Sequence, residues 1–342
     1  MSFALGADGV IISVFACSGV KGMSCTTVEG FTLRPAVIAD FDSVLSLVMA
    51  QNMAGYGEPM VSADTLRELW QSPNLDLGLD NWVAVAPDGQ VAGYAELQHY
   101  SPTQLGLSIY LAREHQRKDI GVHLLQLAET RAARCSVDES VVVLISRVSE
   151  LDQTGKQVVE EAGYNLGLSF LMMERILAEP LEPVQWAPGI TVRAFMPGQD
   201  EQATYLADEE AAEDKGYHSA LTFEEWAKRM SLDGADFDPT LWFLACRGEE
   251  IAGVALNFYS RATGAGWIDH LGVRRRWRNR GIGKGLLLHS FGEFHRRGID
   301  RARLSVDSRS LTNAPRLYER AGMHTVQQYH VYRKEIITSQ IR

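Results

Sequence analysis

Three glycines and a run of basic side chains stand together in residues 273–285, which read V-R-R-R-W-R-N-R-G-I-G-K-G. An apolar, strand-like run precedes them, and the run that follows has helical spacing, with apolar residues at Ile282, Leu286, Leu287, Phe291 and Phe294 and a stop at Gly298. Glycine lets the backbone approach a ligand closely, and the first N–H groups of a helix have no acceptor within it. With the helix dipole behind them, these groups are suited to hold phosphate oxygens.

The spacing within this turn excludes two common phosphate-binding motifs. A dinucleotide fingerprint fails because Gly281 and Gly283 are followed at the third place by Leu286, and a P-loop fails because no Ser or Thr follows Lys284. The pattern that fits is [QR]-x-x-G-x-[GA], met by Arg278, Gly281 and Gly283. An ordinary glycine-rich turn with a solvated basic face would have the same residues.

Composition sets the class of protein. The chain has 342 residues, 46% of them apolar and 22% charged, which predicts a globular protein of two domains. A net charge of −10 argues against nucleic-acid binding, so the basic turn suits a small polyanion. The cysteines form no C-x-x-C pair and no zinc-ligand cluster: Cys17, Cys25, Cys135 and Cys246. We therefore expect a reduced, cytoplasmic protein without a metal.

The first 28 residues differ from the rest. Residues 9–20 are apolar, but they are too few to span a bilayer, and no Lys or Arg precedes them. We interpret 1–28 as an extra strand or a disordered extension, or as upstream sequence with Met23 the true start. Export and membrane association are not expected.

From Gly30 the chain contains a repeat. Strands are predicted at 31–35, 82–86, 90–100, 105–111, 141–145 and 170–176, with helices between them, the first capped by Asp40. The same order returns about 160 residues later, where Ile190–Arg193, Asp200, Trp242–Ala245, Ile251–Gly253 and Ala321–Gly322 match Thr32–Arg34, Asp40, Trp82–Val85, Val91–Gly93 and Ala162–Gly163. A nearly constant offset across five landmarks indicates two copies of one domain.

The element order, the phosphate turn and the closing motif N-A-P-R-L-Y-E-R-A-G-M (313–323) together resemble the GNAT superfamily of acetyl-CoA-dependent N-acetyltransferases. The resemblance covers essentially the whole chain. It implies an α/β fold of two tandem GNAT domains, each with a mixed, mostly antiparallel sheet flanked by helices. We expect an extension at 1–28, a degenerate domain at 29–178, a proline-rich linker at 179–188 and an intact domain at 189–338. Tandem members of the superfamily include mycothiol synthase and some antibiotic acetyltransferases.

The two copies differ where the motifs carry chemistry. The first copy has Asp119 where the second has Gly281, and a carboxylate there opposes a diphosphate by charge and by bulk. It also has Val159 where the second copy has Tyr318, and valine can transfer no proton. We interpret the first copy as a degenerate partner that supports the second; weak coenzyme binding by the first copy is the alternative.

The resemblance assigns roles in the second copy. The backbone of Leu271, Gly272 and Val273 would pair with the pantetheine arm of the coenzyme. The diphosphate would bind the turn and the helix start, at Arg278, Asn279, Arg280, Gly281, Ile282, Gly283 and Lys284. Tyr318 would donate a proton to the thiolate, since a phenol with a pKa near 10 is protonated at neutral pH; packing on the sheet is its structural alternative. Asn313 would orient the coenzyme or cap the helix.

The base and the acceptor are less defined. Asp269, two residues before Leu271, is our candidate base, working through water, while His270 should point to the opposite face by strand alternation. Structural roles are open for both. The acidic run 208–214 borders the acceptor site in the family and would favour a cationic amine, unless it is a solvated helix face.

The function we expect is acetyl transfer to a primary amine, of a small molecule or a peptide, by direct attack in a ternary complex. Neither motif contains a cysteine, so an acyl-enzyme is not suggested. The alternative is a non-catalytic module that binds or senses acyl-CoA. We expect a monomer or homodimer.

Overall fold

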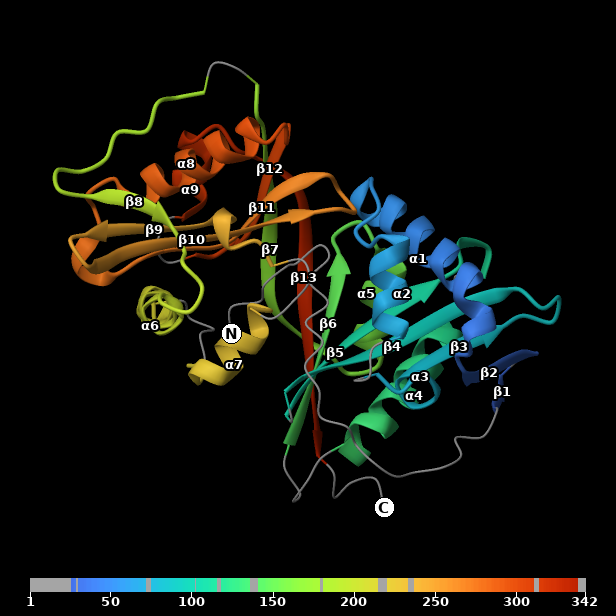
Figure 1. The fold of residues 1–342 in the computed structure, drawn as a ribbon. Coiled ribbons are helices and arrows are strands. Elements are labelled where there is room, and N and C mark those ends of the chain that lie inside the picture. The colour runs from blue at the N-terminus through green and yellow to red at the C-terminus, as the bar shows by residue number, and fades with distance from the viewer. Residues whose placement is uncertain are drawn as a thin grey trace. The chain divides into compact units, whose positions relative to one another are not determined.

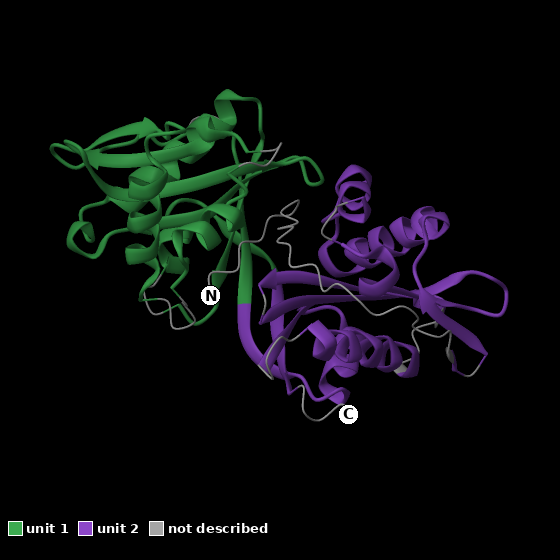
Figure 2. Ribbon diagram, turned by 60° about the horizontal axis from the view of Figure 1, so that its bottom comes forward, with its two compact units in different colours: residues 1–11, 170–327 green, residues 12–169, 328–342 purple. Residues whose placement is uncertain are grey.

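The computed structural model describes residues 26–28, 30–71, 75–101, 103–115, 118–135, 141–178, 181–214, 220–232, 237–310 and 314–337. The chain forms two compact units (Figure 2). The N-terminal unit comprises residues 12–169 and 328–342, and the C-terminal unit comprises residues 1–11 and 170–327. Of the predicted extension 1–28, the described residues Thr26–Val28 form a short strand, β1, and the rest lies outside the described part.

The N-terminal unit contains the first copy of the repeat (Figure 1). Its helices are α1 (Phe41–Tyr56), α2 (Ala63–Trp70), α3 (Leu77–Asp80), α4 (Lys118–Cys135) and α5 (Gln153–Glu161), with short 3-10 turns at Ile38–Asp40 and Arg113–His115. Its strands are β1, β2 (Phe31–Pro35), β3 (Asn81–Val85), β4 (Val91–Ser101), β5 (Gln104–Leu111) and β6 (Val141–Ser149). They lie in that order, antiparallel except for β5 and β6.

The C-terminal unit repeats this order. Its helices are α6 (Glu201–Ala212), α7 (Phe223–Arg229), α8 (Ile282–Arg296) and α9 (Ala314–Arg320), with 3-10 turns at Pro239–Leu241 and Arg275–Trp277. Its strands are β8 (Thr191–Ala194), β9 (Trp242–Arg247), β10 (Glu250–Ser260), β11 (Ala265–Val273) and β12 (Arg301–Asp307). The sheet order is β12-β11-β10-β9-β8, and only the β11–β12 pair is parallel. The predicted fold class, α/β with mixed, mostly antiparallel strand pairing flanked by helices, is confirmed.

Two long strands exchange between the repeats. β7 (Asn165–Ile176) ends the first repeat, but its residues 170–176 pair with β12 in the C-terminal unit. β13 (His324–Ile337) ends the second repeat, but its residues 329–337 pair with β6 in the N-terminal unit. The sheet of each compact unit is therefore completed by the last strand of the other repeat, whereas the boundaries expected from the sequence follow the repeat itself.

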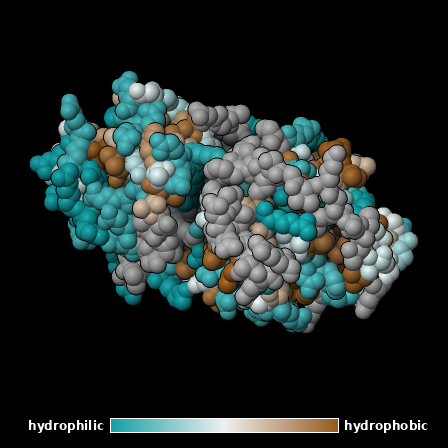
Figure 3. Space-filling model, turned by 90° about the horizontal axis from the view of Figure 1, so that it is seen from below, coloured by the Kyte–Doolittle hydropathy of each residue, from teal (hydrophilic) through white to brown (hydrophobic). Residues whose placement is uncertain are grey.

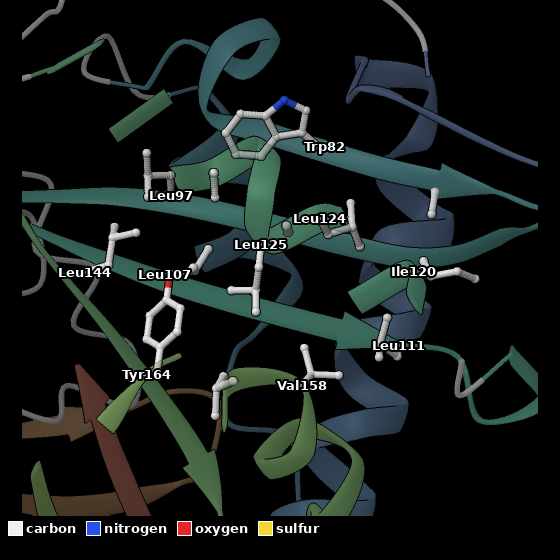
Figure 4. Packing of buried hydrophobic residues seen from close by; sticks show 14 of the residues in the cluster. Trp82, Leu97, Leu107, Leu111, Ile120, Leu124, Leu125, Leu144, Val158 and Tyr164 are labelled. Carbon is white, nitrogen blue, oxygen red and sulfur yellow. The ribbon is translucent and has the colours of Figure 1, made fainter. Parts of the chain in front are cut away.

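Each unit has its own hydrophobic core. In the N-terminal unit, α4 lays Ile120, Leu124 and Leu125 against strand residues such as Leu97 and Leu107, and all five side chains are almost completely buried (Figure 4). These contacts follow from the 3.6-residue period of the helix and the two-residue period of the strands. In the C-terminal unit α8 does the same, with Leu287, Phe291 and Phe294 among its buried residues.

Helices cover both faces of the C-terminal sheet. A Cβ placed on Gly266 would meet the ring of Phe294, which belongs to α8, whereas a Cβ placed on Gly272 would meet Ala211 of α6 at 2.7 Å. Strand β11 is therefore sandwiched between α8 and α6. On the face shown in Figure 3, the residues drawn in colour are mostly hydrophilic, with apolar ones in scattered groups. Among the described residues, no helix is both long and apolar enough to cross a bilayer.

The prediction that Asp40 caps α1 through its side chain is wrong. The carboxylate instead binds both terminal nitrogens of Arg34, at 2.7 and 2.8 Å, and accepts the Val37 N–H. Asp200 does the same in the second copy, with Arg193 and the Met196 N–H. A charge-assisted bidentate pair is stronger than a neutral cap, so the nearby arginine determines where the carboxylate points.

These carboxylates make stability depend on pH. The hydrogen bond from Arg193 to Asp200 lowers the pKa of that carboxyl group below its usual range. The stabilisation is therefore present above the ordinary carboxyl pKa and is lost as the pH falls through the lowered value. We predict that the melting temperature of the wild type falls in acid, and that Asp200→Asn, already destabilised at pH 7, shows a smaller fall. Thermal unfolding between pH 7 and pH 2 measures this; an equal fall in both proteins would contradict it.

Candidate functional site

The central feature of the C-terminal unit is an opening between two parallel strands. The pairing of β11 with β12 comprises Gly266 with Ala302 and Trp267 with Arg303. Beyond Trp267, β11 continues to Val273, and no further residue of a described strand pairs with it on this side. Parallel strands that diverge leave backbone hydrogen-bonding groups available on the inner edges of the opening.

The free edge of β11 can be assigned residue by residue. The Arg274 N–H donates to Ala252 O of β10 at 3.0 Å, and hydrogen-bonded pairs alternate along an antiparallel ladder. Gly272 is therefore bonded to β10, whereas the backbone groups of Leu271 and Val273 point away from β10 into the opening. Val273 O accepts the Nε–H of Arg278 at 3.0 Å. Leu271 O and Val273 N lie on the unpaired edge.

The basic turn connects this edge to α8. Asn279 and Gly281 have positive φ angles of 60° and 79°, and Gly281 is the N-cap of α8. Its carbonyl accepts the Gly285 N–H at 2.9 Å, which starts the helix. The N–H groups of Ile282, Gly283 and Lys284 are thereby directed out of the helix end. A Cβ on Gly281 would meet nothing within 4 Å, so the approach to the turn is open at that residue.

Most of the arginines in the turn are ion-paired within the chain. Arg274 donates to Glu210 at 2.6 Å, Arg275 to Asp214 at 2.5 Å, and Arg278 also binds Asp214. These hydrogen bonds lower the pKa of the Asp214 carboxyl group, with Arg278 the largest cause. The acidic residues thus fix the turn, and their charge cancels much of the basic charge around it.

Further contacts hold the remaining basic residues. Arg276 and the Trp277 indole N–H both bind Glu250, the latter at 2.7 Å, which lowers the pKa of the Glu250 carboxyl group. The Arg280 guanidinium lies over the Trp277 ring, 5.0 Å from its centre. Lys284 is 2.7 Å from Glu182. Arginine stacked on tryptophan keeps its charge and its outward N–H groups.

Asp269 and His270 are brought together more closely than strand alternation predicts. Leu256 of β10 pairs with His270 and the next residue, Asn257, pairs with Ile268, so Asp269 is the extra residue of a β-bulge. Its carboxylate lies 3.9 Å from His270 Nε2. The imidazole Nδ1 is 2.6 Å from Asp208 on α6. The bulge therefore breaks the strand alternation on which the predicted opposite orientation of Asp269 and His270 depends.

Tyr318 lies on α9 and is 8% exposed. It packs in the same hydrophobic cluster as Ile268, with Leu271 at the margin of that cluster, so its ring is on the α8 side of β11. The counterpart in the N-terminal unit, Val159, is buried in the core. Asn313 lies outside the described residues. Within the described part of the chain, no group of three or more His, Cys, Asp or Glu side chains is placed to hold a metal ion.

In the N-terminal unit the equivalent edge is already hydrogen-bonded. Ile109 O and Leu111 N of β5 correspond to Leu271 O and Val273 N of β11, since Ala112 N–H donates to Ala92 O just as Arg274 does to Ala252. The side-chain amide of Gln51, on α1, binds both: its oxygen accepts the Leu111 N–H at 2.8 Å and its nitrogen donates to Ile109 O at 3.4 Å.

The residue of the C-terminal unit that corresponds to Gln51 is Ala211. Each stands eleven residues after the aspartate that pairs with arginine, Asp40 or Asp200. Alanine has no amide, so within the described part of the chain no side chain bonds the edge of β11 as Gln51 bonds that of β5. The helix starts also differ, because α4 already includes Asp119 in its first turn, whereas α8 begins after Gly281. Asp119 places its own negative charge at the positive end of α4.

This fold and site define a class of acyl-group transferase, and the comparison with known families identifies it. The Acetyltransferase (GNAT) family model matches residues 42–153 and again residues 202–323. The chain belongs to the GNAT family and contains two GNAT domains in tandem.

Several curated relatives share one name. A mycothiol acetyltransferase from Streptomyces scabiei is 32% identical over 53% of the chain, and the aligned part is 58% of that relative's length. One from Streptomyces bingchenggensis is 28% identical over 73% of the chain and 79% of the relative.

Solved structures share the tandem arrangement. A GCN5-related N-acetyltransferase from Sphaerobacter thermophilus is 36% identical, with a TM-score of 0.79, and the match covers 91% of the chain and 98% of that structure. A tandem GNAT protein from the clavulanic acid biosynthesis pathway is 14% identical, with a TM-score of 0.67, and the match covers 90% of the chain and 98% of that protein. At this level of identity the likeness supports a shared fold and nothing further.

The structure places the expected residues on neighbouring elements of the C-terminal unit. Leu271 to Val273 end β11, the turn from Arg278 leads into the first residues of α8, and Asp269 and Tyr318 lie on β11 and α9. Sequence reasoning missed Gln51 and Ala211. The repeat offset aligns these two residues, but their meaning depends on which backbone groups of the neighbouring strand are unpaired.

We predict that Ala211→Gln weakens acetyl-CoA binding, because the new amide can bond Leu271 O and Val273 N as Gln51 bonds its own strand. One such hydrogen bond is worth about 1 kcal/mol, so two correspond to a rise in Kd of roughly tenfold or more. Calorimetry on the full chain measures the Kd.

Two variants serve as controls. Ala211→Met has similar length without an amide and should weaken binding less than Ala211→Gln. Gln51→Ala should lower the stability of the N-terminal unit by about 1–3 kcal/mol and speed hydrogen exchange at Leu111, with the Kd for acetyl-CoA unchanged. Equal effects of Gln and Met at position 211 would show that bulk rather than hydrogen bonding is responsible.

Proposed function

We propose that this protein transfers the acetyl group of acetyl-CoA to a primary amine by direct attack, at the opening between β11 and β12 of the C-terminal unit. The observation that carries the proposal is the unpaired edge of β11 at Leu271 and Val273, in line with the N-terminus of α8. A pantetheine arm carries amide groups that can complete such an edge as a third strand would, and the helix start suits the diphosphate.

The contrast between the two copies supports this location. The N-terminal unit has its edge filled by Gln51, an aspartate in the first turn of α4 and Val159 in place of tyrosine. Each of these changes removes one requirement of the reaction: a place for the arm, a neutral helix start and a proton donor. We propose one working site per chain.

The chemistry needs two proton movements. An ammonium group must lose a proton before its nitrogen can attack the thioester carbonyl, and the thiolate that leaves should gain one. Asp269, with its side chain 12% exposed on the bulge of β11, is the proposed base. Tyr318 is the proposed acid, because a phenol is protonated at neutral pH and can donate as negative charge develops on sulfur.

The acceptor is a small-molecule amine in this proposal. The name shared by the relatives points to the amine of mycothiol before acetylation as the first acceptor to test. The acidic run 208–214 does not by itself select a cation, since Glu210 and Asp214 bind arginines of the turn. A suitable panel therefore also includes polyamines, aminoglycosides and peptide N-termini.

We predict that Tyr318→Phe lowers kcat by roughly 10² to 10⁴, while the Kd for acetyl-CoA stays unchanged because phenylalanine preserves the packing. Release of free thiol from acetyl-CoA in the presence of the acceptor panel gives kcat, and calorimetry gives the Kd and the number of sites.

The outcomes separate the alternatives. Turnover that survives Tyr318→Phe undiminished would remove the tyrosine as acid. Saturable acetyl-CoA binding at one site, with no turnover on any amine, would favour a non-catalytic module that binds or senses acyl-CoA.

A further inference from the structure

A buried aspartate and histidine lie directly behind the proposed base. Asp208 on α6 and His270 on β11 have side chains that are each 5% exposed, and Asp208 Oδ2 is 2.6 Å from His270 Nδ1. The same oxygen accepts the indole N–H of Trp226, on α7, at 3.0 Å. Three elements of the unit thus converge on one carboxylate, which is a costly group to bury without partners.

These contacts determine which nitrogen of the imidazole carries the proton. A carboxylate oxygen that already accepts the Trp226 N–H is an acceptor, so the short contact to Nδ1 is an Nδ1–H donated to Asp208. In neutral His270 the lone pair is then on Nε2. That atom is buried and has no hydrogen-bond partner among the residues the structure describes.

Among the described residues, Asp269 places a second carboxylate close to Nε2. Its carboxylate is 3.9 Å away, too far for a hydrogen bond as the side chains stand. A proton that arrives on Asp269 would supply the missing donor. Asp269 would then bond to Nε2 and pass the proton on.

We propose that His270, oriented by Asp208, takes up the amine proton through Asp269 and so keeps Asp269 available as a base. The inference rests on the proposed acetyl transfer at β11. His270 is a positioning and relay residue, since its burial leaves contact with the substrate to Asp269.

The step balances as follows. The ammonium gives one proton to Asp269, which gives it to His270 Nε2, while the Nδ1 proton stays on His270, hydrogen-bonded to Asp208. The amine nitrogen forms a bond to the carbonyl carbon, the bond from that carbon to sulfur breaks, and Tyr318 gives its proton to the thiolate. As the amide forms, the nitrogen loses a second proton, which restores the one lost from Tyr318, and the imidazolium finally releases its proton to water.

The N-terminal unit lacks every part of this arrangement. Ser108 pairs with Glu96 where His270 pairs with Leu256, and Leu107 pairs with Leu97 in regular register, so β5 has no bulge and no counterpart of Asp269. The positions of Asp208 and Trp226 are held by Val48 and Leu66, both buried. The copy whose edge is closed by Gln51 has lost the whole polar set, as expected if the set serves the reaction.

The test is the pH dependence of kcat in His270→Gln, with the best amine from the panel. We predict that kcat falls roughly 10²-fold and that the acidic limb of the pH profile moves to lower pH, because the imidazole no longer takes part in the proton transfer. The Kd for acetyl-CoA should not change. Asp208→Asn should produce the same change in part, and His289→Gln, a half-buried histidine packed on Phe243 of the same unit, should leave the profile as in the wild type.

Substitution of a buried residue can also destabilise the fold, so a double variant is needed to distinguish the relay from a structural effect. Because His270 acts through Asp269, the loss caused by His270→Gln should vanish in an Asp269→Asn background. Additive losses would overturn the relay and indicate a structural role. Nitrogen-15 spectra of the labelled histidines should show His270 protonated at Nδ1 in the wild type, and the opposite tautomer would also overturn the proposal.

Failure of the relay differs from failure of the proposed function. A wild type that acetylates an amine, with an unchanged pH profile in His270→Gln, removes the relay alone. A wild type that acetylates no amine in the panel removes the proposed function.

Discussion

The central physical constraint in this structure is that the backbone N–H and C=O groups on an unpaired strand edge need hydrogen-bond partners. Backbone N–H and C=O groups that leave water must find partners, and a strand that diverges from its neighbour has lost them. The N-terminal unit satisfies the edge of β5 internally, with the amide of Gln51. In the C-terminal unit Ala211 stands at the same place on the helix, and alanine has no amide to bond the edge of β11. This side chain is one of the differences on which the proposal of a single ligand-binding copy rests.

The second organising element is the C-terminal end of α6. Successive carboxylates of this segment bind different parts of the site. Asp208 accepts a hydrogen bond from the His270 imidazole, Glu210 binds Arg274, and Asp214 binds Arg278 of the basic turn. The segment looks in sequence like a solvated acidic face or an attractor for cations. In the structure it is a scaffold that fixes both the strand and the basic turn, so Asp208, Glu210 and Asp214 are already engaged.

Much of this arrangement was predictable, and the reasons for the rest are physical. The repeat, the α8 helix and the Gly281 turn depend on the spacing of residue types along the chain, which can be read from the sequence. The side-chain cap by Asp40 was predicted wrongly because Arg34, six residues earlier, competes with the helix end for the carboxylate. The contact between Asp208 and His270 joins residues far apart in the chain, and the bulge at Asp269 results from the register with β10. Neither follows from periodicity.

The exchange of β7 and β13 has a consequence for how such a protein can evolve. Each sheet is completed by a strand that the other repeat encodes. A gene that lost its first half would also lose the strand that pairs with β12, and would leave β13 without β6. A copy without chemistry of its own could therefore not be deleted without unpairing β12 from β7 and β13 from β6, because each repeat supplies a strand to the sheet of the other unit.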